Sequence, residues 1–367
     1  MIAGMFKDTM VNMNWADIQA CADKNALVLL PLGVIEEHGP HLCLGTDIYT
    51  AHIHSIFIKQ RLEEKGLEVV IAPPFYWGIC QSTGGFIGSF NVRKETAKAL
   101  LVDILASLAG FGFKNVYGIN AHGDIEHSIA VIEAFKEASE QLNLNAAYTF
   151  SQSILHHYGL TGAEPYICPI KPQTIRINTS KSPDVHAGDI ETATIHHFYP
   201  GLADVPKAKS LPPVELGDDK IMTWLFGGHT KELSSAGYLG APADFESVDV
   251  IKNINDIADR APRTLADGEV LSLGSHRVRW LDTPHLPHGW ECGLLSEEST
   301  RTLFCGDLFT QPGTGSLPVT EADILGPSEA FRSQMDYFSH TKNAGAMLDR
   351  LAATAPETLA CMHGSAW

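Results

Sequence analysis

Apolar runs alternate with amphipathic stretches over the first two thirds of the chain. The run Ala26–Leu32 is continuously apolar, which indicates a parallel strand buried on both faces. A stretch with helical character follows from Thr46, a helix-capping residue type, to about Lys65, and Gly66 is a typical stop. This alternation is typical of βαβ units, so we expect an α/β fold with a mainly parallel sheet.

The alternation continues to about residue 200. A glycine-rich loop, Gly78–Gly88, follows the second predicted strand. We expect residues 1–260 to form one domain, a three-layer α/β/α sandwich. Further strands are predicted at Leu67–Ala72, Asn115–Ile119 and Ala146–Phe150, and further helices at Arg93–Leu108, Ile125–Leu142 and Gly188–Phe198.

The pattern changes after about Asp259. Short strand-like runs at Val270–Leu281 and Thr302–Cys305 precede two helical stretches within Ser328–Ala355. We therefore expect a second, α+β segment over residues 268–367. The chain has 367 residues, and a single core usually stops growing near ~250–300 residues, so a second unit agrees with the length.

Composition and charge argue against several classes of protein. The formal net charge is −17 and no local basic patch stands out, so a nucleic-acid partner is not expected. No apolar run is long enough to span a bilayer, and the first residues lack the layout of a signal peptide. Seven scattered cysteines fit reduced thiols better than a disulfide framework. We expect a cytoplasmic protein without a membrane partner.

Carboxylate and imidazole side chains follow two of the predicted parallel strands. Glu36, His38 and Asp47 come after the first strand, and His122 and Asp124 come after the third. Ligands bind at the carboxyl ends of strands in open α/β sheets, and this donor set suits Zn²⁺ or Mn²⁺. The two clusters could hold a pair of ions that share one carboxylate. The alternative is a set of loop polar residues without a metal.

His186 and Glu191 lie at the start of the predicted helix Gly188–Phe198. Amide hydrolysis needs a proton for the leaving nitrogen, and histidine is the common donor near neutral pH. Glu191 could orient His186 or hold a substrate N–H. The alternative is an ordinary capping box around Asp189, which spacing alone favours.

Three motifs, in this order, resemble those of the creatininase (creatinine amidohydrolase) family over about residues 10–255. The first is G-x-x-E-x-H-G-P-H-L-x-L-G-T-D at residues 33–47. The second is N-x-H-G at residues 120–123, and the third is H-A-G-x-x-E-T at residues 186–192. The resemblance implies an amidohydrolase that cleaves a C–N bond of a small cyclic amide or formamide with metal-activated water.

The resemblance also implies two divalent ions per chain, Zn or Mn with iron as an alternative, and a homo-oligomer, for example a hexamer. The substrate would be a small molecule. The implied site residues are Glu36, Asp47 and His122 for one ion, His38, Asp47 and Asp124 for the other, with Asp47 bridging, and the catalytic residues His186 and Glu191.

The chain departs from the family pattern at several positions. Glu37 stands where the family usually has Gln, which adds a negative charge, and Thr83 replaces the usual His. Asp124 stands where creatininase itself has Glu, and Glu126 or His127 could compensate for its shorter arm.

Tryptophan is absent between Trp77 and Trp224, the stretch that precedes the third motif. A ring-stacking contact with substrate would therefore have to come from Tyr158, Tyr166 or another subunit. Creatinine itself is for this reason not expected as the substrate.

The last hundred residues resemble the C-terminal half of metallo-β-lactamase-fold proteins, through His285, Asp307 and His363. The other half of that site, an H-x-[HE]-x-D-H cluster, is absent from the chain. Three ligands are too few for a stable site, so we predict a partial segment that serves packing or assembly. The alternatives are a metallo-β-lactamase-type hydrolase or redox protein that uses this segment, and a non-catalytic scaffold protein.

Overall fold

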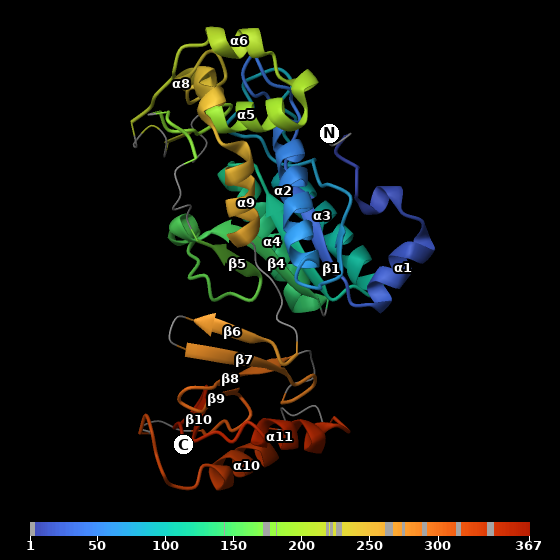
Figure 1. The fold of residues 1–367 in the computed structure, drawn as a ribbon, viewed down its shortest axis with the longest axis vertical. Coiled ribbons are helices and arrows are strands. Elements are labelled where there is room, and N and C mark those ends of the chain that lie inside the picture. Colours follow the sequence, from blue (N-terminus) through green and yellow to red (C-terminus); the bar gives the residue numbers. More distant parts are fainter. Residues whose placement is uncertain are drawn as a thin grey trace. The chain divides into compact units, whose positions relative to one another are not determined.

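The computed structural model describes residues 4–142, 144–171, 177–180, 182–217, 220, 223–224, 230–260, 267–273, 276–287, 292–312, 317–335 and 341–367. The chain forms two compact units, residues 1–262 and 263–367 (Figure 1), and each is described by itself. Among the helices that the structure describes, none is both long and apolar enough to cross a bilayer.

The first unit is built on a five-stranded parallel sheet in the order β2-β1-β3-β4-β5. The predicted α/β fold with a mainly parallel sheet is thus confirmed. The strands are β1 (Leu27–Leu32), β2 (Val69–Ile71), β3 (Asn115–Asn120), β4 (Asn145–Ser151) and β5 (Ile167–Ile170).

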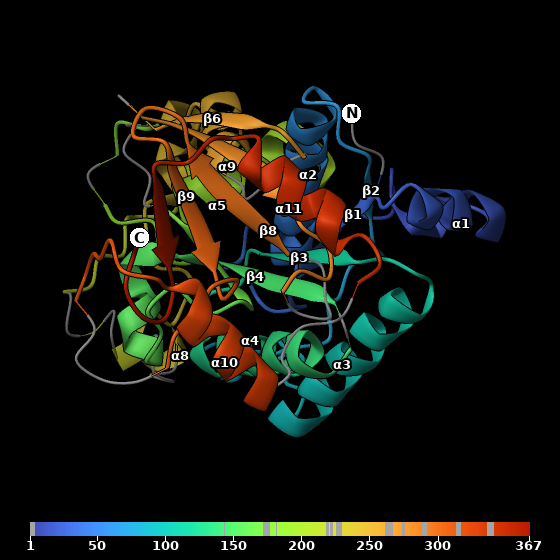
Figure 2. The same ribbon diagram turned by 90° about the horizontal axis from the view of Figure 1, so that it is seen from below.

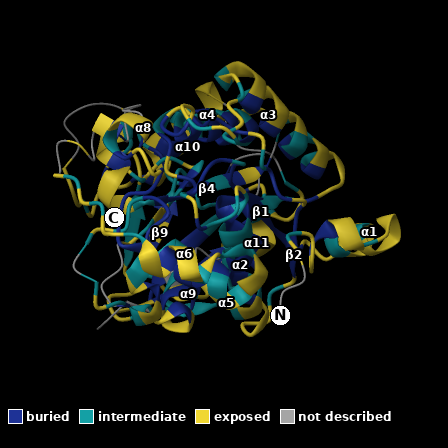
Figure 3. Ribbon diagram, turned by 90° about the horizontal axis from the view of Figure 1, so that it is seen from above, coloured by how far each residue is buried: buried dark blue, intermediate teal, exposed yellow. Residues whose placement is uncertain are grey.

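Helices cover both faces of this sheet, with α3 and α4 on one side and α2, α5 and α9 on the other (Figures 2 and 3). The helices are α1 (Trp15–Asp23), α2 (Thr46–Glu63), α3 (Lys94–Gly110), α4 (Ile125–Gln141), α5 (Asp189–Phe198), α6 (Val205–Ser210), α8 (Thr230–Leu233) and α9 (Val250–Arg260). Short 3₁₀ helices are η1 (Met10–Asn12), η2 (Gln152–Tyr158), η3 (Pro200–Leu202) and η4 (Pro242–Ser247).

The packing of strand β1 on both of its faces explains why its sequence is continuously apolar. Val28 and Leu30 pack into the core cluster that includes residues of α3 and α4. Leu27 and Leu29, which point to the opposite face, pack with residues of α2 and with Ala258 of α9. A strand buried on both faces has no position for a polar side chain, so the apolar run of β1 predicts its central place correctly.

The strand order places a ligand-binding crevice at one point of the sheet. The chain leaves β1 through α2 to reach β2 on one side, and then passes through α3 to β3 on the other side of β1. The two connections diverge above the carboxyl ends of β1 and β3, which is where open α/β sheets bind ligands. The loops that follow β1 and β3 therefore lie side by side.

The second unit contains a five-stranded sheet in the order β10-β9-β8-β7-β6, in which β9 and β10 pair in parallel and the other neighbours antiparallel. Apolar residues of the sheet, such as Leu303, pack with Met347 and Leu351 of α11. The elements are β6 (Val270–Leu273), β7 (His276–Asp282), β8 (Gly293–Glu297), β9 (Thr302–Gly306), α10 (Leu325–Gln334), α11 (Ala344–Ala352) and β10 (Thr358–Cys361). Its resemblance to half of a metallo-β-lactamase fold stays a prediction.

Candidate metal centre

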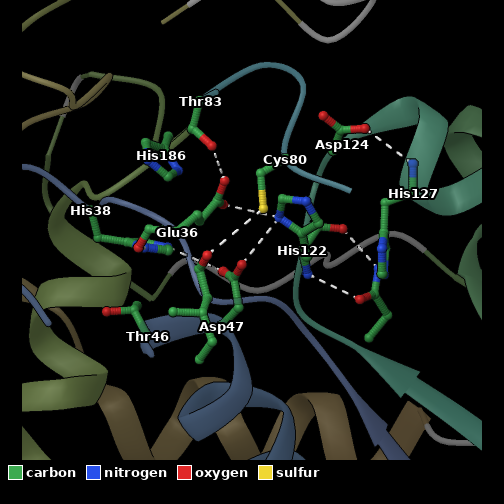
Figure 4. Close-up of polar contacts among 12 residues, drawn as sticks. Glu36, His38, Thr46, Asp47, Cys80, Thr83, His122, Asp124, His127 and His186 are labelled. Atoms are coloured by element: carbon green, nitrogen blue, oxygen red, sulfur yellow. Dashed lines mark hydrogen bonds and ion pairs between the residues drawn. The ribbon is translucent and has the colours of Figure 1, made fainter. Parts of the chain in front are cut away.

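Buried acidic and imidazole side chains meet at the carboxyl ends of β1 and β3 (Figure 4). Glu36 and His38 lie in the loop after β1, Asp47 in the first turn of α2, and His122 in the loop after β3. All four are at most 6% exposed. The strand order thus brings together residues that are up to 86 positions apart along the chain (122 − 36).

The Asp47 carboxylate lies between two imidazoles. Its Oδ1 is 3.1 Å from His38 Nε2, and its Oδ2 is 3.1 Å from His122 Nδ1. The same His122 Nδ1 lies 3.0 Å from Glu36 Oε1. A carboxylate that presents one oxygen to each of two donor sets has the arrangement that a bridging ligand needs.

The backbone fixes the orientation of both imidazoles. His38 Nδ1 is 3.2 Å from the Glu36 carbonyl oxygen, and His122 Nε2 is 2.8 Å from the Ile79 carbonyl oxygen. Because a ring N–H donates to the carbonyl at each of these positions, the other nitrogen of each ring faces the carboxylates. Metal-binding histidines are commonly held by such a bond on the far side of the ring.

The charges of the cluster fit divalent cations. Burial by itself would lower the pKa of His38, but the carboxylates of Asp47, Glu191 and Glu36, with Asp47 the largest contributor, together raise that pKa to about 10. The pKa of His122 is likewise raised, against burial, by Glu36 and Asp47. Among the described residues, only histidines form ion pairs with Glu36, Asp47 and Glu191. The same carboxylates that raise the pKa of the two histidines would be neutralised by divalent metal ions bound beside them.

The third motif adds His186, which a backbone pairing holds in place. Its N–H donates to the Leu239 carbonyl at 3.1 Å, and its carbonyl accepts from the Leu239 N–H at 2.8 Å. His186 Nε2 is 2.9 Å from the Glu37 carbonyl oxygen and 3.4 Å from Glu37 Oε1. The additional negative charge of Glu37 thus faces His186.

Glu191, in the first turn of α5, points toward His38. Its Oε2 is 3.9 Å from His38 Nε2 and accepts a hydrogen bond from the Ala187 N–H at 2.6 Å. In the described part of the chain, three sets of donor atoms lie within 4.8 Å of one another. They are Glu36, His38 and His186; Glu36, Cys80 and His122; and His38, Asp47 and Glu191.

Asp124 does not join any of these sets. Its Oδ1 caps α4 by accepting from the His127 N–H at 3.0 Å. Its Oδ2 accepts from the Gln81 N–H at 2.8 Å, and from the N–H and hydroxyl of Ser82 at 3.0 and 3.1 Å. Four donors occupy most of the acceptor capacity of the carboxylate. Asp124 therefore ties the glycine-rich loop to α4.

The residues considered as substitutes for Asp124 also lie outside the donor sets. Glu126 pairs with Lys94 at 3.8 Å on the surface. His127 is buried, and its Nδ1 accepts from the Ile79 N–H at 3.4 Å. Thr83, by contrast, contributes to the site, because its hydroxyl donates to Glu36 Oε2.

A cavity of about 260 Å³ opens beside the donors. Ser82 and Trp224 line it together with the predicted site residues other than His38. The Trp224 ring lies 5.9 Å from the His186 ring, so an aromatic face comes from a residue that the sequence did not indicate. Tyr158 lines a neighbouring cavity of about 270 Å³ instead. No motif marks Trp224, whose place follows from the tertiary fold alone.

The second unit brings two of its three predicted residues together. His363 Nε2 lies 3.4 Å from Asp307 Oδ1, and the His363 side chain is mostly exposed. No set of three metal donors in the described residues includes either of them. The prediction that this segment holds no metal of its own stays a prediction.

Comparisons with known proteins show which family the chain resembles. A family model described as creatinine amidohydrolase (Creatininase) matches residues 11–260. The chain is similar to the creatinine amidohydrolase of Pseudomonas putida, at 24% identity over 206 residues, which are 55% of this chain and 75% of that protein. It is also similar to the mycofactocin precursor peptide peptidase of Mycolicibacterium smegmatis, at 25% identity over 249 residues, 66% of this chain and 86% of that protein. A solved crystal structure of creatinine amidohydrolase (creatininase) superposes with a TM-score of 0.49 at 17% identity, covering 68% of this chain and 93% of that one.

The placement of Asp124 predicts a structural effect for its removal. Asp124→Ala should lower the free energy of unfolding by ~1–2 kcal/mol, because it removes a helix cap and a loop contact. The number of bound ions per chain, measured by mass spectrometry of the metals, should stay that of the wild type. Asp103→Ala, at an exposed position of α3, is the control and should change neither quantity. Loss of an ion at unchanged stability would show instead that Asp124 is a ligand.

Proposed function

The chain belongs to the creatininase family, and we propose that it is a dinuclear metal-dependent amidohydrolase that cleaves a C–N bond of a small cyclic amide or formamide. The observation that carries this proposal is the Asp47 carboxylate, which faces His38 with one oxygen and His122 with the other. A shared carboxylate between two donor sets is the simplest way to hold two ions at one site.

We divide the donors between two proposed metal positions according to which side chains contact one another. Glu36, Asp47 and His122 would hold one ion, and His38, Asp47 and Glu191 the other. Glu191 thus replaces Asp124 in the ligand set that the family resemblance implies for the second ion. The nitrogen and oxygen donors suit Zn²⁺ or Mn²⁺, with iron as an alternative. Bound there, such ions would supply a nucleophilic water near neutral pH and stabilise charge on the carbonyl oxygen.

The side chains of the cavity would perform the remaining steps. His186 would donate a proton to the leaving nitrogen, because it lines the cavity and sits beside the donors. Its Nε2 faces Glu37, which leaves Nδ1 as the atom available to a substrate. The Trp224 ring would exclude water from one side of the substrate and offer it an aromatic face.

A peptide bond is the second candidate substrate. The mycofactocin precursor peptide peptidase aligns with this chain over 86% of its own length. In addition, the neighbouring cavity shares Asn120, His122 and Gly123 with the catalytic one, so the two adjoin. A substrate that extends beyond the scissile amide would find room there.

The other expectations stay predictions. We expect a homo-oligomer, for example a hexamer, in the cytoplasm, and a packing or assembly role for residues 268–367. Light scattering of the full chain and of a chain ending at residue 260 tests the assembly role, which predicts a change of oligomer or of solubility.

Substitution at Asp47 tests the shared carboxylate. Asp47→Asn should lose at least one ion per chain and nearly all hydrolysis, because the amide is neutral and cannot serve both positions as an anionic ligand. The fold should survive, as judged by circular dichroism. Full metal content in Asp47→Asn would contradict a bridging role.

Substitution at His186 tests the proton donor. His186→Ala should keep both ions and lose about 10²–10⁴-fold in turnover, which is the range of general acid–base catalysis. Metal content and kcat are measured on the same preparation. Metal loss equal to that of Asp47→Asn would mean that His186 is a ligand, which its place in one donor set allows.

A substrate panel separates the two candidate bonds. The metal-loaded chain is tested with creatinine, a cyclic imide, N-formyl amino acids and short peptides, with release of amine as the readout. We expect hydrolysis of a cyclic amide or formamide, abolished in Asp47→Asn. Cleavage confined to the peptides would establish the peptidase candidate, and no cleavage of any class would favour a non-catalytic scaffold.

A further inference from the structure

A cysteine thiol lies among the metal donors. Cys80 comes from the glycine-rich loop, and its sulfur, a carboxylate oxygen of Glu36 and a ring nitrogen of His122 lie within 4.8 Å of one another. All three residues are buried. Figure 4 shows the Cys80 side chain directed at the space between Glu36 and His122. Two ligands of one four-coordinate ion at ~2.0–2.3 Å lie about 3.3–3.7 Å apart, so donors within 4.8 Å of one another would have to close by about 1.5 Å or less on binding.

The loop holds Cys80 firmly at this place. On one side of it, the Ile79 carbonyl accepts from His122 Nε2 at 2.8 Å. On the other side, the Gln81 N–H donates to Asp124 Oδ2 at 2.8 Å. The Cys80 N–H itself donates to Asn91 Oδ1 at 3.1 Å. The backbone around the thiol is therefore anchored to the same loops that carry the other donors.

Among the described residues, the thiol makes only weak hydrogen bonds. Its sulfur is 3.4 Å from the Phe90 carbonyl oxygen and 3.9 Å from that of Ile35, and S–H is a weak donor. Burial and the neighbouring Glu36 and Asp47 carboxylates raise the pKa of the Cys80 thiol. A bound cation reverses this effect, because a coordinating thiol loses its proton outright.

We propose that Cys80 is a thiolate ligand of the ion held by Glu36, Asp47 and His122, and that it makes this position prefer zinc to manganese. The inference rests on the proposed metal centre. Coordination forms a sulfur–metal bond and releases the thiol proton to solvent, with no change of oxidation state.

The donor chemistry gives the reason for the preference. With Cys80, this position offers one sulfur, one nitrogen and two carboxylate ligands, a four-coordinate set that suits zinc. Thiolate ligands favour zinc, whereas manganese prefers oxygen. The other position, with His38, Asp47 and Glu191, has no sulfur among its described donors and carries no such preference.

Cobalt substitution tests the sulfur ligand directly. The full chain is stripped with a chelator and reloaded with Co²⁺, and its near-ultraviolet spectrum is recorded. We expect a sulfur-to-cobalt charge-transfer band in the wild type and in Cys168→Ser, a control cysteine on β5, and no such band in Cys80→Ser. A band that persists in Cys80→Ser would overturn the assignment.

Competition between Zn²⁺ and Mn²⁺ tests the preference. In Cys80→Ser, the ratio of zinc affinity to manganese affinity at one of the two metal positions should fall at least about tenfold. Even the loss of a residue that only supports a ligand lowers metal affinity by ~10–100-fold. An unchanged ratio would contradict the proposal.

X-ray absorption of the zinc-loaded wild type needs no variant, and it decides the question if Cys80→Ser does not fold. A sulfur shell at ~2.3 Å supports the ligand, and a shell of nitrogen and oxygen alone at ~2.0–2.2 Å rejects it. Two bound ions whose spectrum lacks a sulfur shell would reject Cys80 as a ligand and leave the proposed metal centre intact. A wild type that binds no ion would instead contradict the metal centre itself.

Discussion

The buried carboxylate of Asp47 is the group on which the rest of the centre depends. It lies in the first turn of α2, where the positive end of the helix dipole favours a negative charge. The close packing of α2 against β1 fixes its position. A Cβ atom at Gly33 would lie only 2.9 Å from the Ile48 backbone nitrogen, so only glycine allows the end of β1 to approach the start of α2 this closely.

The other donors are arranged around this carboxylate by the topology of the sheet. Because β1 and β3 are neighbours, His38 and His122 reach Asp47 from opposite sides. The glycine-rich loop closes the centre, with Asp124 holding its backbone and the Thr83 hydroxyl holding Glu36. Buried charges of this kind are stable only when each has a partner of opposite charge. Two metal ions would meet that requirement for the carboxylates of Glu36, Asp47 and Glu191 at once.

Much of the fold could be predicted from the sequence, because the first unit buries both faces of its central strands. The continuous apolar run of β1 and the polar residues that follow β1 and β3 are sufficient to place four candidate metal donors at one edge of the sheet. Strand β5 was missed. It is short and contains Pro169, which is tolerated at the edge of a sheet but weakens the strand pattern.

Parts of the centre depend on contacts that no local pattern records. Asp124 precedes a helix, so the same residue fits a cap and a ligand, and only the donors from Gln81 and Ser82 favour the first. Trp224 lines the cavity and Cys80 lies beside Glu36 and His122, and both come from segments without a metal motif. The sequence predicts Glu191 as a catalytic residue that orients His186 or holds a substrate N–H, and its approach to His38 follows from the position of α5 beside α2.

Anomalous diffraction from crystals of the metal-loaded chain, recorded at the absorption edge of the bound metal, tests the dinuclear centre most directly. The proposed centre predicts two peaks in each chain, one on either side of the Asp47 carboxylate. A single peak that Asp47 does not touch, or two peaks that do not share it, would contradict the proposal.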